Sequence, residues 1–122
     1  MAYRSISVWL EDMLMAIRQI EQMTTATNTS QEYSQNKILT LATERSLEII
    51  AEALKNADKQ DAELPISNKR RIINLRNLVN HVYYEVDNEK IWTIIKIDLP
   101  ILREEVIKIL EEYEGRLELN EL

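Results

Sequence analysis

The sequence predicts an all-α fold, most simply an up-and-down bundle of four helices. Glycine occurs once and proline twice in 122 residues, whereas sheets and hairpins need such turn residues at short intervals. The chain is rich in Glu, Lys, Leu, Ile and Ala, a composition typical of helical proteins. Apolar residues recur at spacings of three and four in four segments, which is the period of an amphipathic helix. Four such helices joined by short polar links favour a bundle.

The first predicted helix covers residues 5–23 and the second covers residues 30–56. Thr and Asn residues between them favour turns over helix interiors. The second helix is apolar on more than one side, so we expect it to contact more than one neighbour. Glu48 and Glu52 lie one turn apart on it. Two such carboxylates can bind a metal or share a proton, but they are more often exposed or paired with Lys and Arg, and we favour that interpretation.

The third predicted helix runs over residues 68–81 or slightly beyond, after a polar connector. Ser67 or Asn68 is suited to cap its first turn, because both side chains accept hydrogen bonds from free backbone N–H groups. The apolar positions of this helix are Ile72, Ile73, Leu75, Leu78, Val79 and Val82.

The fourth predicted helix covers residues 89–114, with Asp87 or Asn88 as its N-cap. Pro100 lies inside it and removes one backbone hydrogen bond, which predicts a kink near residues 97–99. Gly115 is suited to end the helix as a C-cap. We expect residues 116–122 to form a flexible polar tail.

The bulk properties indicate one domain, residues 1–122, in a reducing cytoplasm. No apolar run approaches the roughly 20 residues that a membrane helix needs, and the first residues lack the features of a secretion signal. The chain has no cysteine, which excludes disulfides and thiolate metal sites. We therefore expect no membrane association.

The net charge of −6 argues against bulk attraction to nucleic acid, since proteins that bind in that way are basic. Any contact with RNA must come from a local patch of positive charge. The candidate patch comprises Lys69, Arg70 and Arg71, together with Arg76. The alternative, which charge alone favours, is a solvated helix face.

The only histidine of the chain, His81, follows Arg76 by five residues and precedes Tyr83 by two. Histidine exchanges protons near neutral pH, and arginine is always charged and binds phosphate oxygens through its forked N–H groups. A base, an acid and a cation suffice to cleave RNA without a metal or another cofactor. The alternative is that a lone histidine near a helix end is structural.

One imidazole cannot be base and acid at once, so we hypothesise a dimer that brings two His81 side chains into one cleft. Apolar surface beyond the needs of four helices is consistent with a subunit interface. On a straight helix Arg76 and His81 lie about 140° apart, whereas Asn77 shares the face of His81 and can orient its ring. Either the long side chain of Arg76 reaches round the helix toward His81, or the helix distorts near Asn80.

The pattern of Arg76, His81 and Tyr83 resembles the signature of HEPN-domain toxins of the HepT type, in which Arg, four residues, His, one residue and Tyr follow one another. Residues 45–53 are similar to the second-helix segment of that family. Residues 92–102 are similar to its fourth-helix start and kink. The resemblance covers most of the chain.

The resemblance implies a HEPN bundle that forms a homodimer, with Arg76 and His81 of both subunits lining a cleft. It implies a metal-independent endoribonuclease that cleaves mRNA or tRNA, as the toxin of a type VII-like toxin–antitoxin pair. It also implies an MntA-like nucleotidyltransferase antitoxin that transfers AMP from ATP onto Tyr83, with Tyr84 as an open second acceptor. Two alternatives are a non-catalytic partner subunit of a nucleotidyltransferase and a plain dimeric scaffold.

Two supporting residues stay open at this point. Asn80 stands where relatives of this type commonly carry an apolar residue, and it shares a helix face with Arg76. It either binds RNA or is solvated. Glu52 lies in the segment that resembles the family's second helix, where its carboxylate could pair with Arg76 and steady it.

Overall fold

The structure, a computed structural model, describes the backbone of residues 5–79 and 86–121 and the side chains as far as residue 114. All regular structure in those residues is helical, which confirms the all-α prediction. The elements in chain order are α1 (Ile6–Met23), α2 (Ser30–Gln35), α3 (Lys37–Gln60), α4 (Lys69–Ile73), α5 (Leu75–Leu78), α6 (Asn88–Thr93), the π-helix η1 (Ile94–Asp98) and α7 (Leu99–Glu121).

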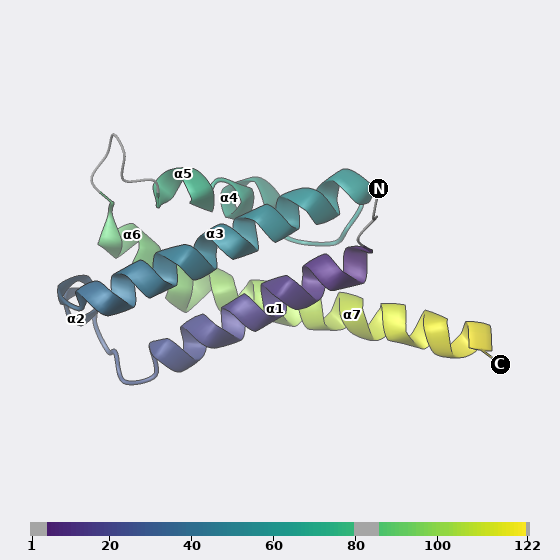
Figure 1. Cartoon of the computed structure of the whole chain (residues 1–122), viewed down its shortest axis with the longest axis horizontal. Coiled ribbons are helices and arrows are strands. Elements are labelled where there is room, and N and C mark those ends of the chain that lie inside the picture. The colour runs from purple at the N-terminus through teal and green to yellow at the C-terminus, as the bar shows by residue number, and fades with distance from the viewer. Residues whose placement is uncertain (1–4, 80–85, 122) are drawn as a thin grey trace.

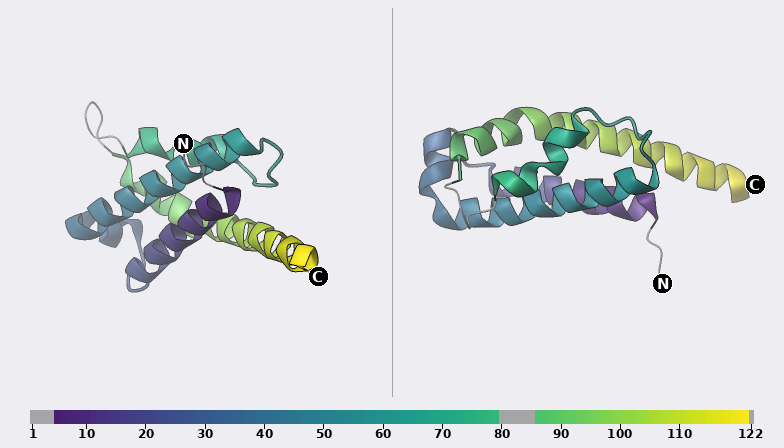
Figure 2. Two further views of the ribbon diagram at one scale, coloured as in Figure 1. Left: turned by 45° about the vertical axis from the view of Figure 1, so that its right-hand side comes forward. Right: turned by 90° about the horizontal axis from the view of Figure 1, so that it is seen from above.

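Three long helices, α1, α3 and α7, form the body of the molecule (Figure 1). Helix α1 packs along α3 and also contacts α7, while α4 and α5 lie on α3 and α2 contacts α6. The C-terminal part of α7 projects beyond the other helices (Figure 2). In the described part of the chain no helix has both the length and the hydropathy of a membrane span.

A single apolar core joins the long helices. The inward residues of α1 are spaced by three and four, as the sequence predicts, and they are Leu10, Met13, Ala16, Ile17 and Ile20. They meet buried residues of α3 and α7, among them Leu47, Ile50, Leu54, Leu102 and Val106. Apolar burial of this extent stabilises the bundle and keeps α3 in a fixed position beneath α4 and α5.

The second predicted helix is two helices, because Asn36 interrupts it. Asn36 has extended backbone angles, φ −93° and ψ 91°, and its side chain accepts a hydrogen bond from the N–H of Leu39 at 3.1 Å. It therefore ends α2 and caps α3, which continues to Gln60 rather than residue 56. As expected, α3 contacts several neighbours: α1, α2, α4 and α5.

The third predicted helix is also two short helices, with Asn74 between them. Asparagine competes with the helix backbone for hydrogen bonds and favours turns. Asn68 occupies the N-cap of α4 in a left-handed conformation, φ 57°, without a side-chain cap bond. The prediction that this helix reaches His81 was wrong, because α5 ends at Leu78 and Val79 is its C-cap.

The fourth predicted helix forms as α6, η1 and α7. The side chain of Asp87 accepts a hydrogen bond from the N–H of Lys90 at 3.1 Å, which confirms Asp87 as the cap. The helix widens into η1 just before Pro100, whose missing N–H and ring disturb the preceding turn, and its axis curves there (Figure 2). The predicted end at Gly115 was wrong, since α7 continues to Glu121. One glycine costs a helix only about 1 kcal/mol.

Candidate functional site

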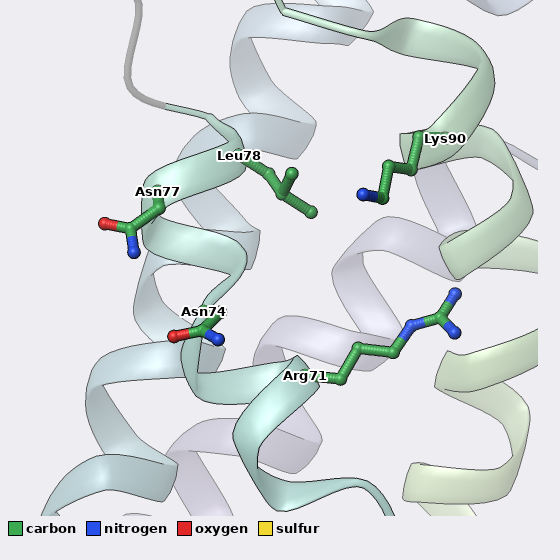
Figure 3. A pocket seen from close by; sticks show the side chains of 5 residues that line it. All are labelled: Arg71, Asn74, Asn77, Leu78 and Lys90. Atoms are coloured by element: carbon green, nitrogen blue, oxygen red, sulfur yellow. The ribbon is translucent and has the colours of Figure 1, made fainter.

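A cleft of about 600 Å³ lies between α4–α5 on one side and α6 on the other. Its lining residues are Arg71, Asn74, Asn77, Leu78 and Lys90. Figure 3 shows Leu78 and Lys90 pointing into the space between the helices, while Asn74 and Asn77 point to the side away from Lys90. Arg71 belongs to the predicted basic patch, and Asn77 and Leu78 lie between Arg76 and His81 in the sequence.

The lining of this cleft is positively charged. Among the residues that the structure describes, it contains the cations Arg71 and Lys90 and no carboxylate, although the chain as a whole carries a net charge of −6. Low-dielectric walls concentrate the field of such charges in a cleft. The cleft is therefore a place where an anion can bind to an otherwise acidic protein.

Arg71 is held by an ion pair with Asp98 of η1. Its Nη2 lies 3.0 Å from Asp98 Oδ2, and the Asp98 side chain is only 9% exposed, whereas that of Arg71 is 49% exposed. The contact is close enough for an ion pair but does not have hydrogen-bond alignment. A carboxylate this buried needs a compensating charge, so Arg71 is positioned from within the fold while about half of its side chain remains exposed.

Lys69 and Arg70, the other members of the predicted basic patch, do not join Arg71 in the cleft. The Nζ of Lys69 lies 3.1 Å from Asp58 Oδ1 and donates a hydrogen bond to the Ala62 carbonyl at 2.7 Å. Lys69 thus fastens the start of α4 to the end of α3. Arg70 is exposed and has no ion-pair partner among the residues that the structure describes.

Arg76 and Glu52 come together across α5 and α3. Arg76 Nη1 lies 3.8 Å from Glu52 Oε2, and both side chains are mostly exposed. Glu48 pairs instead with Arg45, at 3.3 Å. The interpretation that Glu48 and Glu52 are exposed and paired with basic residues is confirmed. No group of three or more His, Asp or Glu side chains suited to a metal occurs in the described residues.

The remaining predicted site residues are Asn77, which is exposed on α5, and four others, Asn80, His81, Tyr83 and Tyr84, which lie outside the described residues. The expected common faces, Asn77 with His81 and Asn80 with Arg76, assumed a continuous helix. Because α5 ends at Leu78, helical spacing no longer supports either pairing.

Sequence reasoning missed Lys90 and Asp98. Lys90 follows His81 by nine residues in a different helix, and no periodic pattern links it to Arg71. Asp98 gave a weak signal, since it is the only carboxylate in a run, residues 94–99, that is apolar except for Lys96 and Asp98. An acidic residue in such a run often has a buried basic partner.

Comparison with known proteins decides the family. The sequence pattern described as ribonuclease HepT-like matches residues 13–109, which is well over half of the chain. The chain belongs to the HepT-like ribonuclease family. The matched region includes α3, both short helices of the cleft wall, and the sequence from Arg76 to Tyr83.

Relatives within the HepT-like family are similar over most of this chain. A protein of Thermococcus cleftensis named as a probable ribonuclease HepT is 34% identical over 82% of this chain and 91% of its own length. A protein of Methanocaldococcus jannaschii named as a candidate RNase is 30% identical over 87% of this chain and 97% of its own.

Another protein of Methanocaldococcus jannaschii, named as a gamma-glutamylcyclotransferase and candidate RNase, is 31% identical over 89% of this chain. The chain spans only 49% of that relative. No solved structure matches the chain.

Proposed function

We propose that this HepT-like chain is a metal-independent endoribonuclease that acts in the cytoplasm on mRNA or tRNA as the toxin of a type VII-like toxin–antitoxin pair. The observation that carries the proposal is the position of Arg76. Its guanidinium is exposed on α5, beside Glu52, and its neighbours Asn77 and Leu78 line the positive cleft. An arginine in that position can bind the phosphate of an RNA chain.

In this proposal His81 supplies the proton chemistry. A neutral imidazole removes the proton of a ribose 2′-hydroxyl, whose oxygen attacks the adjacent phosphorus. The bond from phosphorus to the 5′-oxygen breaks, and an imidazolium protonates that oxygen. The products are a 2′,3′-cyclic phosphate and a 5′-hydroxyl, while Arg76 stabilises the charge that develops on the phosphate.

His81 follows Leu78, a residue of the cleft lining, by three positions in the sequence. Asn77 and Asn80 support the substrate or the imidazole, and Glu52 steadies Arg76. In a homodimer, His81 of each subunit takes one of the two proton-transfer roles, because a single imidazole is either protonated or neutral at a given moment.

The proposed antitoxin is an MntA-like nucleotidyltransferase that transfers AMP onto Tyr83. The added phosphate carries negative charge close to Arg76, where it competes with the phosphate of RNA. Incubation with the partner and ATP should therefore add AMP mass to a peptide that contains Tyr83. Loss of the modification in Tyr83→Phe supports the assignment, and retention of it on Tyr84 contradicts it.

The second candidate is a non-catalytic subunit that binds a nucleotidyltransferase, and the acidic net charge of −6 is the observation that favours it. Expression in cells separates the two. A toxin arrests growth, and Arg76→Ala or His81→Ala abolishes arrest without loss of helicity. Arg45→Ala is the matched control, since it also removes an exposed ion pair from α3. Absence of arrest by the wild-type protein would favour the binding subunit.

A further inference from the structure

The catalytic proposal leaves two cations of the cleft unused. We propose that Arg71 and Lys90 form a phosphate-binding subsite that holds the backbone of single-stranded RNA beside the scissile bond. The identity of the ligand as RNA rests on the proposed function, whereas the site itself rests on the geometry of α4, α6 and η1. The subsite positions substrate and takes no part in proton transfer.

The arrangement of Arg71 supports a role in binding. Asp98 is nearly buried and lies 3.0 Å from one terminal nitrogen of the guanidinium. Arginine has five N–H donors in a fixed fork, so one contact with Asp98 orients the group and leaves other donors for a ligand. Half of the side chain is exposed, and Arg71 lines the cleft.

Lys90 supplies the net charge of the subsite. The Arg71–Asp98 pair is neutral as a unit, so the ammonium of Lys90 is the uncompensated charge among the described residues of the lining. Lys90 is exposed, and its side chain points into the cleft from α6 (Figure 3). Lys69 offers a contrast, because its ammonium is already bound by Asp58 and the Ala62 carbonyl.

The shape of the site favours a nucleic-acid strand over an isolated phosphate. Arg71 and Lys90 line one cleft from two different helices, α4 and α6, and Arg76 lies on α5 next to Asn77 of the same lining. A single-stranded RNA carries a phosphate at every nucleotide and can contact several such cations in succession. Leu78 adds an apolar surface between them, which suits a ribose or base rather than an inorganic ion.

Binding of a fluorescently labelled single-stranded RNA tests the subsite. All proteins carry His81→Ala, so that the RNA stays intact. Lys90→Ala should weaken binding about three- to tenfold and lower the slope of log affinity against log salt by about 0.7, the value for one phosphate contact on a single strand. Lys108→Ala, which removes the same charge from an exposed position on α7, should bind like the parent protein.

Arg71 is tested without leaving Asp98 unpaired. The double variant Arg71→Gln with Asp98→Asn removes both charges of the pair, and its melting temperature shows whether the fold is intact. It should weaken RNA binding while leaving the net charge unchanged. Equal affinity of the parent, Lys90→Ala and double variants, or no RNA binding by the parent, would overturn the subsite. Displacement of RNA by inorganic phosphate at equal phosphate concentration would overturn its assignment to a strand.

This design keeps the two proposals apart. If the wild-type protein does not cleave RNA but Lys90→Ala still loses affinity, the nuclease proposal fails and the subsite stands. If the wild-type protein cleaves RNA and Lys90→Ala leaves both KM and the salt slope unchanged, the subsite fails alone. The expected result with active protein is a higher KM for Lys90→Ala with little change in kcat.

Discussion

The contact between Arg76 and Glu52 indicates how a single residue can be steadied and still remain available. Both side chains are more than half exposed and the charged atoms are 3.8 Å apart. Exposed pairs of this kind contribute only about 0–1 kcal/mol. A phosphate can therefore replace Glu52 as the partner of Arg76 at small cost. The pairing agrees with the prediction from the sequence that Glu48 and Glu52 are exposed or paired with Lys and Arg.

The residues that anchor the cleft were harder to predict. Asp98 is buried because η1 turns it toward Arg71, and the sequence shows only an acidic residue among apolar ones. Lys69 and Arg71 are two residues apart in one basic run, yet they bind carboxylates on different elements, Asp58 and Asp98. Tertiary contacts, not spacing, decide which basic residue remains available to a ligand.

Tyr33 provides a test of burial at the residue scale. It is fully buried against Trp92, with ring centroids 5.7 Å apart. Burial raises the pKa of its hydroxyl above the usual 10.0, Thr43 opposes the shift, and the charge of Glu44 adds to it. The unfolded chain therefore loses this proton at a lower pH than the folded chain. As a result, the free energy of unfolding is unaffected by Tyr33 below about pH 10 and falls as the pH rises further.

Replacing Tyr33 with Phe should remove that alkaline loss. At pH 7 the substitution should change stability by less than about 1 kcal/mol, because the hydroxyl has no well-aligned hydrogen bond to lose. Thermal unfolding of both proteins between neutral pH and pH 11 measures the effect. A wild-type curve that stays parallel to the Tyr33→Phe curve throughout would contradict it.

At the scale of elements, the sequence predicts the long helices well and the short ones poorly. The apolar period places α1 correctly, since the helix covers Ile6–Met23 where the sequence predicts residues 5–23. Single asparagines then divide two predicted helices, at Asn36 and at Asn74. The periodic pattern continues across both residues, so only the backbone conformation reveals the breaks. The break and early end of α5 changed the geometry expected around Arg76.

The N-cap of α3 should be worth about 1 kcal/mol. Asn36→Ala removes the bond from its side chain to the N–H of Leu39, and chemical denaturation measures the loss. Asn74→Ala is the matched control, because Asn74 precedes α5 without a side-chain cap bond. We expect the control to change stability by less than about 0.5 kcal/mol. Equal losses in the two variants would show that the cap bond of Asn36 is not the cause.

For the whole molecule, composition and periodicity are enough to predict an all-α bundle, because the chain lacks the turn residues that a sheet needs at short intervals. The cleft could not be predicted in the same way. Its two cations come from α4 and α6, two helices that no periodic pattern in the sequence links. The net charge of −6 also gives no indication that one cleft is lined by cations.

A two-fold site makes a prediction about the assembly. If each cleft needs His81 from both subunits, specific nuclease activity should fall on dilution as dimers dissociate. Light scattering over the same concentration range should show the mass falling from twice that of the chain toward that of one chain. Constant specific activity at concentrations where only monomer is present would contradict the two-fold site.

Cleavage of purified RNA by the wild-type protein, with a metal chelator present and His81→Ala alongside, tests the central claim most directly. The account predicts that the wild-type protein produces fragments ending in 2′,3′-cyclic phosphate and 5′-hydroxyl groups, and that His81→Ala produces none while retaining its helicity and melting temperature. Cleavage that the chelator abolishes, or cleavage by His81→Ala at the wild-type rate, would contradict it.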